Sequence, residues 1–232
     1  MFVDITDIYQ KFDDLAITFS GSVDAGQMLV ITGHSGSGKS TVLRMIAGLL
    51  DESKKAGHAG TICIGGTDVS ELAPGKRGIG MAFQSPSLFM HMTVEDNVAY
   101  GLRSRGMSRK EARLKAHDML ERMGLSADIF ARRMPANLSG GEQQRVSLAR
   151  TLVIEPKLVL FDEPFSALDA PLRKKLGAEL RSQQKELGFA GIMVTHDLDE
   201  AVLLADQITV MNHGVQTWTG LPADFSEDRL SH

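Results

Sequence analysis

The sequence predicts an α/β fold in which a mostly parallel β-sheet is flanked by helices. Apolar runs rich in β-branched residues alternate with stretches of helical periodicity along most of the chain, which is typical of parallel strands joined by helices. Short alternating runs before residue 30 indicate an antiparallel β edge. The strand pattern disappears between residues 87 and 137, which indicates an inserted helical subdomain.

The hydrophobic pattern assigns residue ranges to the strands of the predicted sheet and to the first helix. An apolar run predicts a strand at 27–32, and the periodic stretch after it predicts a helix at 40–50. Further strands are predicted at 61–64, 78–83, 157–161, 191–195 and 207–211. We therefore expect a single domain over residues 1–232, with an α/β core made of residues 1–86 and 138–232 and the helical subdomain at 87–137.

The clearest helix of the inserted segment begins after Ser108. Glu111 three residues later completes the pattern of a capping box, and Gly124 is a typical helix stop. One face of this helix carries apolar residues at helical spacing: Ala112, Ala116, Met119, Leu120 and Met123. The opposite face is basic and carries Arg109, Lys110, Arg113 and Arg122. A basic amphipathic helix can lie on a membrane, but a basic face more often is simply the outer, solvent-exposed side of a helix.

Amino-acid composition and net charge indicate a globular protein without a disulfide or a membrane-spanning segment. The chain has 43% hydrophobic residues and a formal net charge of −4, an ordinary globular composition that gives no support for a nucleic-acid partner. Cys63 is the only cysteine, so an internal disulfide is excluded and a reducing compartment fits. The sequence has neither an apolar run of the roughly 18–20 residues that span a membrane nor a signal peptide. We expect a soluble, intracellular protein.

A phosphate-binding loop is the strongest motif. Residues 33–40, GHSGSGKS, match G-x-x-x-x-G-K-[ST] between a predicted strand and a predicted helix. Glycines let consecutive backbone N–H groups surround a phosphate, while Lys39 would reach the β- and γ-phosphates and the Ser40 hydroxyl would bind Mg²⁺. The residues expected to contact the nucleotide here are Gly33, His34, Ser35, Gly36, Ser37, Gly38, Lys39, Ser40 and Thr41.

A second motif supplies the acidic groups that this chemistry needs. In KLVLFDEP, four apolar residues predict a buried strand with Asp162 at its carboxyl end, where open α/β sheets bind ligands. Asp162 would hold Mg²⁺ directly or through water, and Glu163 would polarise the attacking water as a general base. A strand that ends in a solvated acidic turn is the alternative, which the nearby phosphate-binding loop disfavours.

A second anion site is predicted in NLSGGEQQRV, residues 137–146. Ser139 can cap a helix here, and Glu142 completes a capping box. Gly140 and Gly141 leave backbone N–H groups bare at the positive end of the helix dipole. The chain therefore carries two separate phosphate-binding motifs.

These motifs, in this order and spacing, resemble those of the ATP-binding cassette (ABC) ATPases. The resemblance covers nearly the whole chain and implies a P-loop NTPase fold of the ABC type. It implies that Gln84 links the core to the helical subdomain and senses Mg²⁺ and the γ-phosphate, and that His196 contacts the γ-phosphate. The loop SALD, which ends at Asp169, would cross to a partner subunit. Phe12 would stack on adenine, although Tyr9 could serve instead, or Phe12 could be a core aromatic.

The resemblance also implies why two phosphate-binding motifs are present. In ABC ATPases two subunits pack head to tail, so Ser139, Gly140 and Gly141 would bind the γ-phosphate of an ATP held by the second ATPase subunit, here expected to be another copy of the chain. ATP and Mg²⁺ are the implied cofactors.

The implied function is the ATPase subunit of a bacterial importer, in the cytoplasm and peripheral on the inner face of the membrane. Its partners would be separate permease subunits and, indirectly, a solute-binding protein. The motifs look similar to those of ATPases that serve importers of thiamine, inorganic anions, ferric iron or polyamines. Many of those ATPases carry an additional C-terminal regulatory domain, which we do not expect here because the sequence ends at His232. The alternative is a soluble ABC ATPase that moves no solute. A GTPase is disfavoured because the sequence has no N-K-x-D motif.

Overall fold

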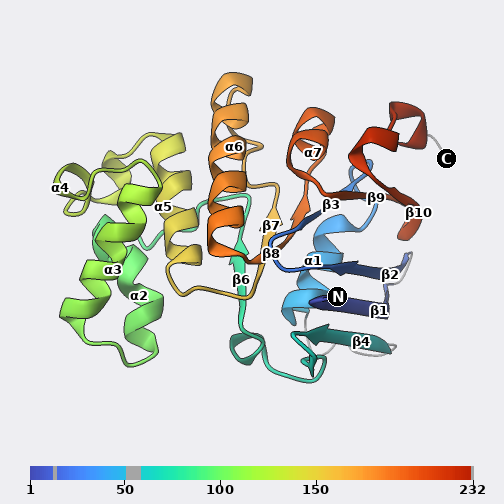
Figure 1. Ribbon diagram of the computed structural model, residues 1–232, viewed down its shortest axis with the longest axis horizontal. Helices are drawn as coiled ribbons and strands as arrows, with labels where there is room; N and C mark the ends of the chain where they lie inside the picture. Colours follow the sequence, from blue (N-terminus) through green and yellow to red (C-terminus); the bar gives the residue numbers. More distant parts are fainter. Residues whose placement is uncertain (13–14, 51–58, 231–232) are drawn as a thin grey trace.

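A computed structural model describes residues 1–12, 15–50 and 59–230 (Figure 1). Its larger sheet has the strand order β10-β9-β3-β8-β7-β6. Five of these strands are parallel: β3 (Met28–Thr32), β6 (Ile79–Ala82), β7 (Leu158–Asp162), β8 (Ala190–Val194) and β9 (Gln207–Asn212). These strands confirm the predicted parallel sheet. The edge strand β10 (Val215–Gly220) pairs antiparallel with β9 and was not predicted.

A second sheet confirms the predicted antiparallel part of the fold. It has the order β2-β1-β4-β5 and consists of β1 (Val3–Lys11), β2 (Ala16–Val23), β4 (Ala59–Ile64) and β5 (Thr67–Asp68). β4, predicted at 61–64, thus pairs with β1 instead of joining the parallel sheet. One apolar cluster connects both sheets through α1 (Lys39–Ala47) and includes Phe19, Leu43 and Leu160. The antiparallel sheet is therefore packed against the helix that follows the phosphate-binding loop.

α1 is shorter than predicted. The helix begins at Lys39, after Gly38, and ends at Ala47 instead of residue 50. Gly48 has a left-handed conformation with φ 73°, and its N–H bonds to the last carbonyls, which is a common way to end a helix. The buried guanidinium of Arg77 donates to the Met45 and Ile46 carbonyl oxygens at 3.3 and 2.8 Å, and a cation is favourable at this end of a helix.

Helices dominate the segment at 87–137, in which the structure describes every residue and finds no strand. It contains α2 (Val94–Ser104), α3 (Arg109–Arg122) and α4 (Ala127–Phe130), and α5 (Gly140–Leu152) packs against α2 and α3 (Figure 1). The predicted apolar face of α3 is buried and its predicted basic face is exposed. Ser108 caps α3, but Glu111 accepts from the Ser108 hydroxyl, so only half of the predicted capping box forms.

The other α-helices of the described residues are α6 (Ala170–Leu187) and α7 (Leu198–Leu204). In Figure 1, α6 lies between α5 and α7. Short 3₁₀ turns occur at Pro74–Lys76, Pro135–Asn137, Pro222–Asp224 and Glu227–Leu230. Within the described ranges, none of the helices combines the length and the apolar composition that a membrane crossing requires.

Candidate active site

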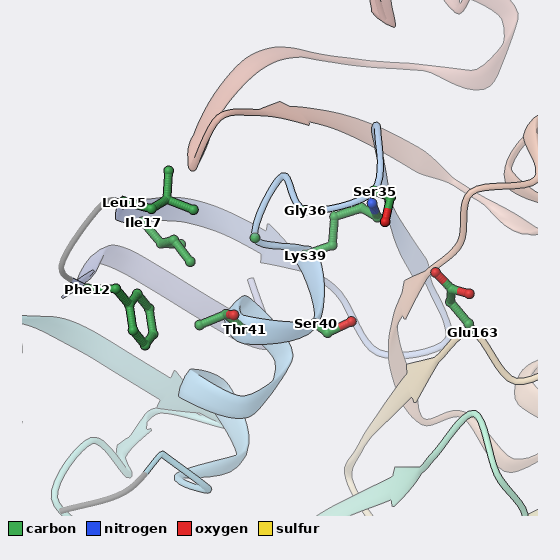
Figure 2. Close-up of a pocket in the computed structure, with 10 residues that line it drawn as sticks. Phe12, Leu15, Ile17, Ser35, Gly36, Lys39, Ser40, Thr41 and Glu163 are labelled. Atoms are coloured by element: carbon green, nitrogen blue, oxygen red, sulfur yellow. The ribbon is translucent and has the colours of Figure 1, made fainter. Parts of the chain in front are cut away.

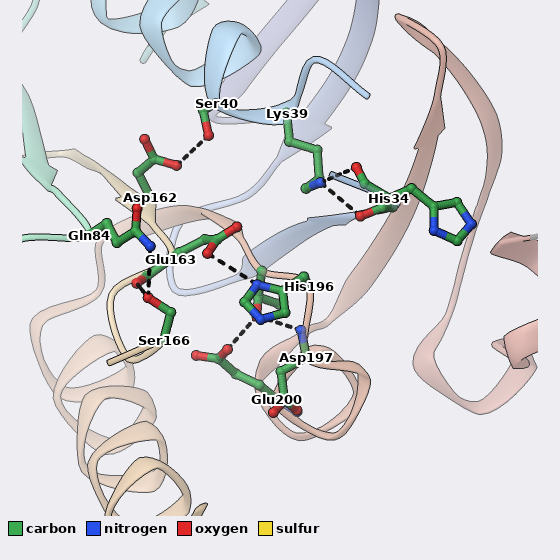
Figure 3. Close-up of polar contacts among 12 residues, drawn as sticks. His34, Lys39, Ser40, Gln84, Asp162, Glu163, Ser166, His196, Asp197 and Glu200 are labelled. Carbon is green, nitrogen blue, oxygen red and sulfur yellow. Dashed lines mark hydrogen bonds and ion pairs between the residues drawn. The ribbon is translucent and has the colours of Figure 1, made fainter. Parts of the chain in front are cut away.

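Six of the predicted site residues gather where the parallel strands end, namely Lys39, Ser40, Gln84, Asp162, Glu163 and His196 (Figure 3). β3 continues into the phosphate-binding loop, β7 ends at Asp162, and Gln84 and His196 lie two residues beyond the ends of β6 and β8. Parallel pairing places these carboxyl ends on one edge of the sheet. This edge is where open α/β sheets bind ligands.

The phosphate-binding loop has a backbone that only glycine adopts without strain. Gly33 has φ 143° and Gly38 has φ 101°. A Cβ atom on Gly33 would lie 2.1 Å from the Met211 carbonyl oxygen, so a side chain there would collide with β9. The fold itself therefore requires glycine at position 33, in addition to any requirement of the proposed ligand.

Lys39 is held across this loop. Its Nζ donates to the Gly33 and His34 carbonyl oxygens, each at 2.8 Å, and the residue is only 6% exposed. Burial lowers the pKa of the Lys39 ammonium from its usual value, while the charges of Glu163 and Asp162 oppose this effect. The loop thus keeps the ammonium group at the carboxyl edge, near the two acidic residues.

Ser40 and Asp162 form the part of the site that fits a magnesium ion. The Ser40 hydroxyl donates to Asp162 Oδ1 at 2.7 Å, and Asp162 is buried. Hydroxyl and carboxylate oxygens suit Mg²⁺, which usually takes few protein ligands and completes its shell with water and phosphates. The pair therefore fits a magnesium ion that arrives with a nucleotide. Among the described residues, no cluster of three or more His, Cys, Asp or Glu side chains could hold a metal.

Glu163 and His196 form a second pair. Glu163 Oε2 lies 3.1 Å from His196 Nδ1. Glu163 has φ 46°, unusual for a residue other than glycine, and its N–H donates to the Val194 carbonyl oxygen at 3.0 Å. Backbone strain of this kind concentrates at functional sites. Gln84 joins the same edge through Ser166: its Nε2 donates to the Ser166 hydroxyl oxygen at 3.2 Å.

A cavity of about 370 Å³ lies beside the phosphate-binding loop (Figure 2). Phe12, Leu15 and Ile17 form an apolar wall, and Glu163 lies at the opposite side. The loop and helix contribute Ser35, Gly36, Gly38, Lys39, Ser40 and Thr41. Such a cavity can hold a flat ring at one end and phosphates at the other. Tyr9 is not among the described residues that line it.

Three residues of the loop have structural roles and are not among the residues that line the cavity. The carbonyls of Gly33 and His34 hold Lys39. Ser37 is buried, and its carbonyl oxygen accepts from the Gly214 N–H at 3.0 Å. These residues shape the loop that the other residues present to the cavity.

The motif predicted as a second phosphate site begins α5, and its predicted capping box is confirmed. Ser139 accepts from the Glu142 N–H, and the Glu142 carboxylate accepts from the Ser139 N–H at 2.7 Å. This bond lowers the pKa of Glu142 from its usual value. In the described ranges, the N–H groups of Gly140 and Gly141 have no acceptor. Among the described residues that line the cavity at α1, none comes from 139–141.

Sequence reasoning missed several contacts around the site. Asp169, predicted to face a partner, is the N-cap of α6 and accepts from the Leu172 N–H at 2.9 Å. Gly141 is buried, and a Cβ atom on it would lie 2.9 Å from Leu172 Cδ2, so this glycine also allows α5 to approach α6. Leu15 and Ile17 were missed as cavity walls, although the alternation of AITF at 16–19 indicates a strand with one buried face.

Comparisons with known proteins identify the family of the chain. The family model described as "ABC transporter" matches residues 17–166. The Fe(3+) ions import ATP-binding protein FbpC of Rhizobium etli is 48% identical over 206 residues, which cover 89% of this chain and 56% of that protein. The protein of the same description from Brucella abortus is 44% identical over 226 residues, which cover 97% of this chain and 62% of that protein. The chain thus spans less than two thirds of the length of these relatives.

A solved structure agrees over almost the whole chain. CbiO1 of Clostridium perfringens, part of the ABC transporter complex CbiONQ, superimposes with a TM-score of 0.84 and is 28% identical. The match covers 98% of this chain and 92% of CbiO1. With the family model, the relatives and this structure in agreement, the chain belongs to the ABC transporter family.

Proposed function

We propose that the protein hydrolyses ATP and that this reaction powers solute import through a separate membrane permease. The observation that carries the proposal is the arrangement at one sheet edge, where the Ser40–Asp162 pair and the Glu163–His196 pair lie beside the phosphate-binding loop. The family supports ATP binding, and the printed names of the relatives support import.

Each residue has a defined role in this proposal. The backbone of residues 33–41 and the Lys39 ammonium bind the phosphates, and Phe12 stacks on the adenine. Ser40, Asp162 and Gln84 hold Mg²⁺, which, when bound, neutralises charge on the β- and γ-phosphates. Glu163 accepts the proton of the attacking water, and His196, 3.1 Å from Glu163, contacts the γ-phosphate. The segment 87–137 acts as the helical subdomain that Gln84 connects to the core.

The second subunit completes the site. The Gly140 and Gly141 N–H groups have no acceptor among the described residues, and together with Ser139 they bind the γ-phosphate of ATP on a second copy of the chain, where Asp169 also makes contact. Two charge-assisted hydrogen bonds of about 1.5 kcal/mol in each of two sites total about 6 kcal/mol. Loss of the γ-phosphate would therefore weaken the closed dimer by roughly 10⁴-fold, so hydrolysis opens it.

The partners follow from the same family. The chain would act at the cytoplasmic face of the membrane with permease subunits and, indirectly, with a solute-binding protein. Ferric iron is the proposed cargo, because relatives 44–48% identical carry the name Fe(3+) ions import ATP-binding protein. A soluble ABC ATPase that moves no solute is the second candidate.

The test has two stages. The purified chain should release phosphate from ATP only in the presence of Mg²⁺, and EDTA should abolish the reaction. In the source organism, deletion of the gene should abolish uptake of ⁵⁵Fe³⁺, and plasmid-borne wild type but not Glu163→Gln should restore it. Absence of phosphate release would reject the ATPase, whereas phosphate release with unchanged uptake would reject iron as the cargo.

A further inference from the structure

Arg173 lies in the first turn of α6 and contacts two separate loops of the candidate site. Its Nη2 donates to the Leu168 carbonyl oxygen at 3.0 Å, and its Nη1 forms an ion pair with Asp197. Leu168 belongs to the loop at 166–169, and Asp197 directly follows His196. One guanidinium therefore connects the loop expected to cross to the partner with the turn that carries His196.

The turn around His196 is fixed by hydrogen bonds on both sides of the histidine. The Asp197 N–H donates to Thr195 Oγ1 at 3.0 Å, and Asp197 Oδ1 accepts from the Glu200 N–H at 2.9 Å. The Thr195 hydroxyl donates in turn to the Glu200 carboxylate. Movement of Asp197 would therefore shift this turn and with it His196, whose Nδ1 lies beside Glu163 (Figure 3).

The other loop is connected to Glu163. The Leu168 N–H donates to the Phe165 carbonyl oxygen at 3.0 Å, and the Ser166 hydroxyl donates to the Glu163 carbonyl oxygen at 3.1 Å. The Ser166 oxygen also accepts from Gln84. A displacement of this loop would thus move Ser166, which contacts Glu163, and, through Arg173, would move Asp197, which directly follows His196.

The Arg173–Asp197 pair is poorly explained by stability alone. The two side chains are 23% and 25% exposed, so the pair is partly shielded from water and loses part of its hydration. The Arg173 Nε is buried and has no acceptor in the part of the chain that the structure describes, which is a further cost. Apolar residues often replace such pairs without loss of stability, so a role in positioning accounts better for this arrangement.

We propose that Arg173 is a positioning residue, which holds His196 against Glu163 and transmits movements of the 166–169 loop to His196. The role of Arg173 in positioning His196 does not depend on the proposed function, whereas its effect on ATP hydrolysis rests on the proposed ATPase function. Two measurements on the full chain test these parts separately.

The first measurement is hydrogen–deuterium exchange of the nucleotide-free protein. Arg173→Met should speed exchange in peptides that cover 163–169 and 194–200 by about 10-fold, as for loss of a charge-assisted hydrogen bond. Peptides from 39–47 should not change. Lys175→Met removes a charge from the same helix at an exposed position and should leave all these peptides unchanged. Unchanged exchange at 194–200 in Arg173→Met would overturn the proposal; if this variant does not fold, Asp197→Asn replaces it with the same expected result.

The second measurement is steady-state ATP hydrolysis. Arg173→Met should lower kcat by about 10- to 100-fold, the usual cost of a misplaced catalytic group, with the KM for Mg·ATP unchanged. In a His196→Ala background the same substitution should cause no further loss, because Arg173 acts through His196. An equal further loss there would overturn the proposal. If wild type releases no phosphate, the ATPase proposal fails, and the exchange result decides the role of Arg173 alone.

Discussion

Replacement of Glu163 by glutamine removes the proposed general base with little change of shape. Glutamine can adopt the same backbone conformation, and the backbone N–H that donates to Val194 remains. An amide oxygen or NH₂ group can still contact His196 Nδ1, which now lies 3.1 Å from Glu163 Oε2. What the variant loses is the basic oxygen that would take a proton from water.

The expected loss of turnover follows from that single change. General base catalysis contributes about 10²–10⁴-fold, which corresponds to about 3–5.5 kcal/mol of transition-state stabilisation. The proposed phosphate-binding groups, Lys39 and Ser40, are untouched, so affinity for Mg·ATP should remain near wild type. Because hydrolysis would no longer open the dimer, the variant should elute as an ATP-bound dimer.

The assay combines phosphate release at saturating Mg·ATP, nucleotide affinity by fluorescence and size exclusion with and without ATP. Glu227→Gln makes the same chemical change at an exposed position and should behave as wild type in all three. Near-normal turnover of Glu163→Gln would remove Glu163 from the role of base and with it the interpretation of the Glu163–His196 pair.

Three further substitutions test other parts of the proposal. Lys39→Ala should abolish ATP binding or hydrolysis while the circular dichroism spectrum stays native; an unfolded variant would instead assign the buried lysine a structural role. Phe12→Ala should weaken ATP affinity by about 1–3 kcal/mol, the usual value for stacking of a base on an aromatic ring, and a loss in Tyr9→Ala alone would move the role to Tyr9. Ser139→Arg should preserve ATP binding by dilute monomer and abolish hydrolysis, and a mixture with Lys39→Ala should regain activity because one composite site is then intact. Loss of nucleotide binding by the Ser139→Arg monomer would show that the motif acts within its own subunit.

Features with a local physical cause could be predicted from the sequence. The capping box at Ser139 depends on groups three residues apart, and the phosphate-binding loop depends on consecutive glycines. The early end of α1 also has a local cause, because Gly48 terminates the helix. The predicted helix was too long because the apolar Leu49 and Leu50 continue the periodic pattern beyond this glycine. β10 was missed because VQTWTG carries few apolar residues, as suits a strand at the sheet edge.

Contacts between distant segments could be predicted only where two motifs were expected to share a ligand, as for Ser40 and Asp162. The bond between Gln84 and Ser166 joins residues 82 positions apart, and that between Arg173 and Asp197 joins residues 24 apart. Neither pair has a sequence spacing that indicates contact, because the parallel strands and α6 bring them together. Gly141 illustrates the same limit: its motif indicated a ligand, whereas its packing against Leu172 depends on how α5 meets α6.

Gly140 separates a requirement of the fold from a requirement of a ligand. A Cβ atom on Gly33 would collide with the Met211 carbonyl, and one on Gly141 would press on Leu172. A Cβ atom on Gly140 would meet no atom of the described residues within 4 Å, and Gly140 is not among the residues with positive φ. Glycine lowers helix propensity, so within one subunit this position would be more stable as alanine. The advantage of glycine must then lie in something that approaches the exposed start of α5 from outside. Among the described residues that line the cavity at α1, none comes from 139–141, which is compatible with the proposal that a nucleotide carried on a second subunit approaches this position.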